Sequence, residues 1–131
     1  MTALSYAGRM EEDLLWLIAN PQFEERPPSI MEFCGPNYLN IAKHLRKRIM
    51  RELVEIFGTE FVPGRIAVYN QALITGGIGI GKTTIASVVL TYMCCAALCL
   101  KDTQDYYNLL QGSAFAFLQM LTSSKQALDV I

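Results

Sequence analysis

The spacing of apolar residues predicts two helices in the first half of the chain. A first helix is predicted over residues 8–19, with Ser5 as its cap. Acidic residues 11–13 precede its apolar run, and acids are favourable near the positive end of a helix dipole. Pro27-Pro28 then predicts an extended linker. A second helix is predicted over residues 36–57, with Gly58 as its stop and with one apolar stripe formed by Leu45, Ile49, Leu53, Ile56 and Phe57.

The second half of the chain alternates short apolar runs with a long apolar helix. Residues 71–75 predict a short buried strand, and residues 85–100 predict a helix. A loop is predicted over residues 101–111, followed by a second buried strand over residues 113–120. Ser123 and Ser124 are the predicted caps of a terminal helix that begins at about Lys125.

Between the first strand and the long helix lies the motif G-x-x-x-x-G-K-T, at residues 76–83. Its glycines let the backbone turn tightly and aim N–H groups at an anion, and the following helix adds the positive end of its dipole. In such a loop Lys82 reaches the β- and γ-phosphates of a nucleotide, and the Thr83 hydroxyl ligates Mg²⁺. The sequence therefore predicts a site for ATP and Mg²⁺. The predicted binding residues are Gly76, Gly77, Ile78, Gly79, Ile80, Gly81, Lys82, Thr83 and Thr84.

A strand, a glycine loop and a helix in this order predict an α/β fold, the three-layer fold of P-loop NTPases. We predict a helical lead-in over residues 1–62 and the first part of an ATPase core over residues 63–131. Two strands are too few for a parallel sheet that is covered on both faces, so the sheet is expected to be incomplete. Its exposed edge predicts poor solubility.

Three other interpretations of this region compete with a phosphate-binding loop. The first is a glycine-rich turn that binds nothing, but the predicted strand before the loop and helix after it are the context that a phosphate-binding loop requires. A dinucleotide-binding G-x-G-x-x-G fails because Lys82 takes the third glycine position after Gly77 and Gly79, although Asp102 lies where a ribose-binding acid could be. Residues 83–100 carry no charge, which is borderline for a membrane span. A helix packed on a sheet explains the same apolarity, so no membrane partner is predicted.

Composition and charge narrow the class of protein. Hydrophobic residues make up 52% of the 131 residues, which is enough for a core and argues against disorder. The net charge of −1 gives no overall field that would attract nucleic acid. Four cysteines without C-x-x-C spacing predict free thiols in the reducing cytoplasm, and His44 is expected at the surface. The basic side of the second helix is either a solvated face or a nucleotide or nucleic-acid contact; it comprises Lys43, Arg46, Lys47, Arg48 and Arg51.

The acids that a P-loop ATPase requires are not visible after the glycine loop. Hydrolysis needs an acid at the end of a second strand to hold Mg²⁺ and a group that orients the attacking water. Beyond Lys82 the acids are Asp102, Asp105 and Asp129, and the last glutamate is Glu60. No catalytic residue is therefore assigned, and whether the chain is an enzyme stays open. At most, weak nucleotide binding is expected from this chain alone.

The residues around the loop resemble the large terminase subunit of tailed bacteriophages. The resemblance is carried by residues 74–84, by Leu-Thr-Tyr-Met at 90–93 and by Leu-Cys-Leu-Lys-Asp at 98–102, with Tyr106-Tyr107 before a glycine. Residues 29–33 and 37–39 are similar to the lead-in of that family. Many terminases carry an arginine inside the glycine loop, whereas this chain has Ile78 and Ile80 there.

This resemblance implies the N-terminal part of a viral DNA-packaging motor, in which Lys82 and Thr83 perform the phosphate and Mg²⁺ work. It implies double-stranded DNA, a portal protein and a small terminase subunit as partners, an oligomer only in the full-length motor, and the host cytoplasm as the location. The second acidic motif, catalytic glutamate and nuclease carboxylates of that family have no counterpart here. Two alternatives stay open: another small P-loop NTPase or kinase, and an inactive phage-derived remnant.

Overall fold

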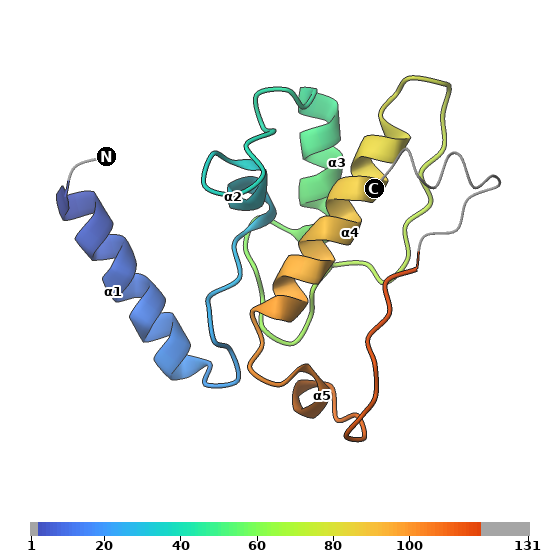
Figure 1. Cartoon of the computed structure of the whole chain (residues 1–131). Helices are drawn as coiled ribbons and strands as arrows, with labels where there is room; N and C mark the ends of the chain where they lie inside the picture. Colours follow the sequence, from blue (N-terminus) through green and yellow to red (C-terminus); the bar gives the residue numbers. More distant parts are fainter. Residues whose placement is uncertain (1–2, 119–131) are drawn as a thin grey trace.

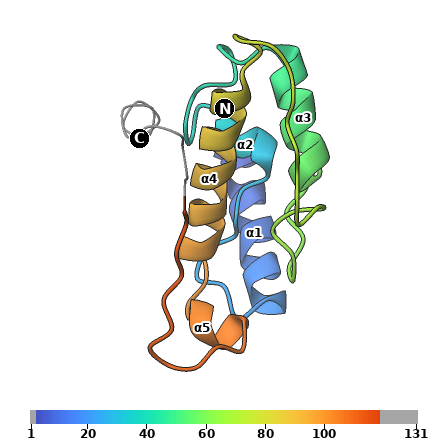
Figure 2. The ribbon, with the colours of Figure 1, turned by 90° about the vertical axis from the view of Figure 1, so that its right-hand side faces the viewer.

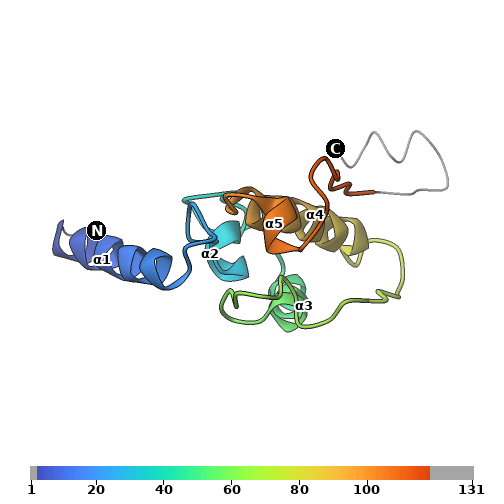
Figure 3. The same ribbon diagram turned by 90° about the horizontal axis from the view of Figure 1, so that it is seen from below.

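The computed structural model describes residues 3–118, which form five helices joined by long irregular segments (Figure 1). Helices α3 and α4 run side by side and begin at the same end of the molecule (Figures 1 and 2). Helix α1 extends away from the rest, as the view from below shows (Figure 3). The helices are α1 (Ala3–Ala19), α2 (Ile30–Cys34), α3 (Lys47–Phe57), α4 (Lys82–Leu98) and α5 (Thr103–Tyr106).

The main core joins α2, α3 and α4. Ile49, Leu53 and Phe57 recur on one face of α3 at helical spacing and are buried against α4. The Tyr92 ring from α4 packs against Phe57 with ring centroids 4.6 Å apart. The cluster of buried side chains consists of Ile30, Phe33, Cys34, Ile49, Leu53, Phe57, Ile85, Val88 and Tyr92. This core fixes the relation between the start of α3 and the start of α4, where the glycine loop lies.

A second, smaller core lies at the other end of α4. Phe23 pairs with Leu100 in an isolated antiparallel bridge, and both residues are buried together with Cys99. The Phe23 ring makes edge-to-face contacts with three other rings, those of Trp16, Phe61 and Tyr106. These contacts tie the last turn of α1 and the end of α5 to the end of α4.

Helix α2 is a helix that the sequence prediction missed. Ser29 and Glu32 form a capping box, in which the Ser29 hydroxyl accepts from the Glu32 amide and the Glu32 carboxylate accepts from the Ser29 amide. The extended linker that Pro27-Pro28 predict ends at this cap. Burial of Ile30, Phe33 and Cys34 then holds the five-residue helix on the main core.

The predicted second helix is right in its second half and wrong in its first. Helix α3 ends at Phe57, and the predicted stop Gly58 follows it with φ +87°, a value that glycine adopts readily. Residues 36–46 form turns instead of helix. Asn40 takes the left-handed conformation, with φ +52°, and the Cys34 carbonyl accepts from the amides of both Ile41 and Ala42. These local bonds reverse the chain before α3 begins, so His44 lies on an exposed turn and not in a helix.

Other predicted boundaries also move. Helix α1 begins at Ala3, so Ser5 lies inside it and is not its cap. Helix α4 begins at Lys82, directly after the glycine loop, and ends at Leu98. The predicted loop over residues 101–111 contains α5, whose first amides are capped by the Asp102 carboxylate. The predicted helix from Lys125 lies outside the described residues.

The predicted sheet is not confirmed. Within residues 3–118 the structure contains two isolated bridges, Phe23 with Leu100 and Val62 with Arg65, and no strand. Residues 71–75 were predicted to be buried, yet all five are exposed, and the Leu73 side chain is 90% exposed. Residues 114–118 of the second predicted strand are exposed too, while residues 119–120 lie outside the described part. An apolar run becomes a strand only when a neighbouring strand completes its hydrogen bonds, and in residues 3–118 none does so.

No helix in residues 3–118 is long and apolar enough to cross a membrane. The prediction of two regions divided at residue 62 stays a prediction. Residues from both sides of that point contribute to the main core, since α3 precedes it and α4 follows it.

Candidate functional site

The glycine loop is a turn that depends on left-handed backbone at three positions. Gly76, Gly79 and Gly81 have φ of +146°, +81° and +94°, a range that side-chain-bearing residues rarely adopt. At two of them a side chain would also force a neighbouring isoleucine to shift. A Cβ on Gly76 would collide with the Ile80 side chain, and a Cβ on Gly81 would lie 2.5 Å from Cδ1 of Ile49 in α3. The loop conformation therefore requires glycine at these positions.

Helix α4 starts at the end of this loop with its first amides unused inside the helix. The first amide that bonds back along the helix is that of Ile85, which donates to the Gly81 carbonyl at 3.0 Å. The amides of Lys82, Thr83 and Thr84 precede it, and Gly81 has no side chain with which to cap them. Since α4 is 17 residues long, its dipole adds a partial positive charge at the same place. This end of α4 is thus suited to an anion.

The Lys82 side chain turns back over the loop. Its ammonium group donates to the carbonyl oxygens of Gly76 and Gly77, at 2.6 and 2.7 Å. The cation is therefore held at the start of the loop by two of its carbonyls.

An open cleft of about 610 Å³ lies over this turn and is lined by residues 78–84. Thr83 and Thr84 are exposed in the first turn of α4, and Lys82 is half-buried. The structure thus brings the predicted site residues from Ile78 to Thr84 to one surface, with Gly76 and Gly77 bound to the Lys82 ammonium. Thr83 is the predicted Mg²⁺ ligand, and it lies beside Lys82 in this turn.

Two residues of α3 and its cap contact the loop, and sequence reasoning did not connect them with it. Arg46 donates from Nη1 to the Gly79 carbonyl at 3.2 Å, across 33 positions of sequence. Ile49 packs beside Gly81. The only sequence signal was the basic side of the predicted second helix, for which a nucleotide contact was one of two interpretations.

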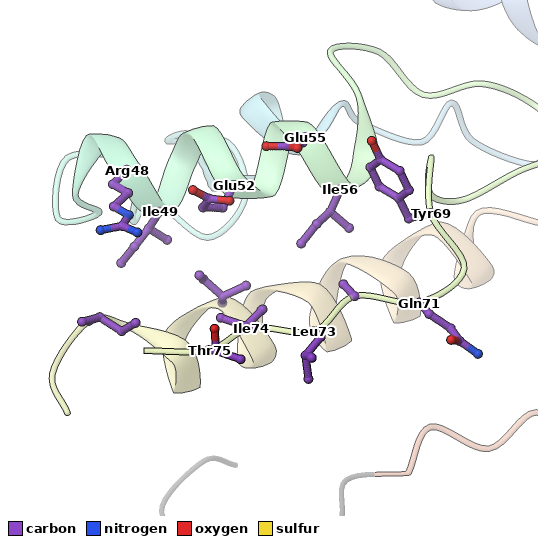
Figure 4. A pocket seen from close by; sticks show the side chains of 13 residues that line it. Arg48, Ile49, Glu52, Glu55, Ile56, Tyr69, Gln71, Leu73, Ile74 and Thr75 are labelled. Carbon is purple, nitrogen blue, oxygen red and sulfur yellow. The ribbon is translucent and has the colours of Figure 1, made fainter. Parts of the chain in front are cut away.

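A second cleft, of about 340 Å³, adjoins the loop between α3 and residues 69–75 (Figure 4). Arg48, Glu52 and Glu55 line it from α3, and Ile80 and Thr75 line it from the loop side. Gln71 also lines this cleft.

The acids after the loop lie far from it. Helix α4 is 17 residues long, which separates its two ends by about 25 Å at 1.5 Å per residue. Asp102 and Asp105 follow its far end, where Asp102 caps α5 (Figure 1). Neither carboxylate can meet a metal ion that Thr83 holds, and Asp129 lies outside the described residues. No group of three His, Cys, Asp or Glu side chains within residues 3–118 is placed to hold a metal ion by itself.

The four cysteines are free thiols in the structure, as the sequence predicted. Cys34 and Cys99 are buried, and Cys94 and Cys95 are half-buried. Burial raises the pKa of Cys34 and Cys95, and it raises the pKa of Cys99 to about 12. A raised pKa makes a thiol a poorer nucleophile and metal ligand at neutral pH, which fits a packing role for Cys34, Cys95 and Cys99.

Comparison with known proteins supports the interpretation of the loop. Searches of curated proteins and of solved structures found no match. A family model does match, over residues 11–131, and its description is "Uncharacterized protein MJ0330, N-terminal P-loop domain". The matched residues include α3, the glycine loop and α4. The description of this family names no terminase, so the match does not support the resemblance to that family. The chain therefore belongs to this family of P-loop domains.

Proposed function

We propose that this chain binds ATP with Mg²⁺ at residues 76–84. The observation that carries the proposal is the combination of a glycine-dependent turn, the uncapped start of α4 and the Lys82 ammonium on one surface. A polyphosphate fits this surface, because amides and an ammonium group are donors that phosphate oxygens accept. Membership of a family of P-loop domains supports nucleotide binding in general, and ATP is our specific proposal.

The chain's own residues have separate tasks in this proposal. The glycine loop and the first amides of α4 surround the phosphates, and Lys82 leaves the carbonyls of Gly76 and Gly77 to contact the β- and γ-phosphates. Thr83 supplies a hydroxyl to Mg²⁺, which would keep its other ligands from phosphate oxygens and water. When bound, Mg²⁺ supplies positive charge beside the phosphates.

Thermal unfolding with and without ATP and Mg²⁺ tests this binding. We expect ATP to raise the melting temperature of the starting protein and to have no effect on Lys82→Ala. Lys101→Ala is a matched control, since Lys101 is an exposed lysine beyond the far end of α4. Absence of any ATP effect on the starting protein would sink the proposal.

Hydrolysis by residues 3–118 alone is not part of this proposal, because Asp102 and Asp105 lie about one helix length from Thr83. Phosphate release measured against Lys82→Ala decides the point. Equal rates are expected for the two proteins.

A role in viral DNA packaging is a finer proposal that rests on the flanking residues alone. Two of these flanking residues have structural roles in this fold, since Leu100 is buried in the smaller core and Asp102 caps α5. The partners would then be double-stranded DNA, a portal protein and a small terminase subunit. The alternatives are another small P-loop NTPase or kinase, and an inactive phage-derived remnant. Reading the genes on either side separates a phage-derived protein from another small P-loop NTPase or kinase, because portal or capsid genes are expected only at a phage-derived locus. The ATP-dependent rise in melting temperature then separates a nucleotide-binding motor fragment from an inactive remnant. The free thiols favour the cytoplasm, of the host if the protein is viral.

A further inference from the structure

We propose that Arg46 is a second cation of the phosphate site, and that it contacts the polyphosphate chain of the bound nucleotide. This inference rests on the proposed function and adds a residue to the same site. Arg46 precedes α3 and is exposed, yet its guanidinium reaches the glycine loop and donates to the Gly79 carbonyl at 3.2 Å.

Arg46 and Lys82 make the same kind of contact from two sides of the loop. Lys82 donates to the carbonyls of Gly76 and Gly77, and Arg46 donates to the carbonyl of Gly79. A carbonyl oxygen carries only a partial negative charge, so a phosphate oxygen is the stronger acceptor for either cation. Arg46 is exposed and Lys82 is half-buried, so each side chain can exchange its loop carbonyl for a phosphate oxygen with little repacking.

The charge order along α3 points to the same conclusion. Arg46, Lys47 and Arg48 stand at the start of the helix, whereas Glu52 and Glu55 follow in its second half. A helix dipole favours the opposite order, with acids near the start and bases near the end. The basic start of α3 therefore works against the local stability of this helix, and such local conflicts are expected at functional sites.

The core holds this basic end in place. Ile49 is buried one turn after Arg46 and packs beside Gly81, so α3 cannot shift away from the loop without exposing Ile49. Arginine suits the role better than lysine, because its planar guanidinium can bind two phosphate oxygens at once. The interior of the loop carries Ile78 and Ile80, which have no charge, and Arg46 adds a positive charge beside the loop.

Calorimetric titration with ATP, ADP and inorganic tripolyphosphate tests the proposal on the full chain. Arg46→Gln should weaken the binding of all three by about 10- to 100-fold, the usual contribution of a hydrogen bond between charged groups. Arg46→Lys should recover part of this loss. Arg51→Gln is the matched control, because Arg51 is an exposed arginine of the same helix whose partner is the neighbouring Glu52.

The outcomes separate this inference from the proposed function. If the starting protein binds none of the three ligands, nucleotide binding itself is wrong. If it binds them and Arg46→Gln binds as tightly as Arg51→Gln, Arg46 is no part of the site. Without ligand, the melting temperatures of all variants should agree within a few degrees, since Arg46 and Arg51 are exposed. A weaker ATP affinity of Arg46→Gln with an unchanged melting temperature supports the contact between Arg46 and the polyphosphate.

Discussion

Three glycines of the loop allow backbone strain and side-chain overlap to be measured separately. Gly77 is not among the glycines with positive φ, and a Cβ on it would meet nothing within 4 Å. Gly79 has φ +81° with equally open space, and Gly81 combines φ +94° with a contact to Ile49. Replacing each by alanine adds one methyl group. From Gly77 to Gly79 the variants add the cost of positive φ, and from Gly79 to Gly81 they add the contact with Ile49.

The structure sets the order of the three effects on the free energy of unfolding. Alanine restricts the unfolded chain, which stabilises a protein by about 0.4–1 kcal/mol where the native backbone permits it, so Gly77→Ala should be neutral or slightly stabilising. At Gly79 the left-handed backbone costs about 1–2 kcal/mol, which leaves a net loss of about 1 kcal/mol. At Gly81 overlap with a buried side chain adds about 1–3 kcal/mol, for a total loss of about 2–4 kcal/mol.

A fourth variant isolates the overlap. The atom nearest to the new methyl group is Cδ1 of Ile49, and Ile49→Val removes that atom. Alone, Ile49→Val should lower the free energy of unfolding by about 0.5–1.5 kcal/mol. Combined with Gly81→Ala it should lose less than the sum of the two single variants, because the overlap is relieved.

Urea unfolding at pH 7 without nucleotide measures the five variants and the starting protein, with equal denaturant slopes as the check that only stability has changed. Equal losses for Gly79→Ala and Gly81→Ala would refute the contact between Gly81 and Ile49. Strict additivity in the double variant would refute it as well, even if Gly81→Ala alone is strongly destabilising. A neutral Gly79→Ala would refute the left-handed conformation of the loop.

Three further predictions concern the supports of the site. Tyr92→Phe removes a buried hydroxyl that donates to the Pro28 carbonyl at 2.8 Å, and should lower the free energy of unfolding by about 1–3 kcal/mol in urea, because it leaves that carbonyl unpaired. Ser29→Ala breaks the capping box of α2 and should cost about 1 kcal/mol in the same assay, with Ser29→Asp restoring most of it. Burial raises the pKa of Cys99 to about 12 from an ordinary value near 9, so the unfolded chain alone loses this proton as the pH rises from about 9 to about 12. The contribution of Cys99 to the free energy of unfolding should therefore be fully present below pH 9 and decline above it. Urea midpoints measured from pH 7 to 10.5 should fall less steeply for Cys99→Ala than for the starting protein.

The parts of the fold that the sequence predicted well are those with local causes. The presence of a helix after the glycine loop and the end of α3 at Gly58 follow from residues close to each feature, although α4 begins at Lys82 and not at residue 85. The capping box of Ser29 and Glu32 is equally local, so α2 could have been predicted from the same kind of signal. The turn at Asn40 was harder to predict, because the chain around it has the apolar spacing of a helix and the decisive bonds go back to Cys34.

The predicted strands failed for a non-local reason. An apolar run such as residues 71–75 specifies an extended segment only together with the strand that pairs with it, and pairing depends on residues far away in sequence. The family match confirms a P-loop domain, and the sheet is the part of that fold which residues 3–118 do not display.

The site shows the same division between local and distant causes, with one instructive exception. The phosphate-binding loop can be read from eight consecutive residues, whereas the contact of Arg46 with Gly79 spans 33 positions and no short motif encodes it. A local trace of that contact nevertheless exists. Three consecutive bases stand at the start of a helix whose acids come later, and this order opposes the helix dipole. A solvated face would gain stability from the reverse order, so the sign of the charges, more than their number, supports the proposal that an anion binds at this end of α3.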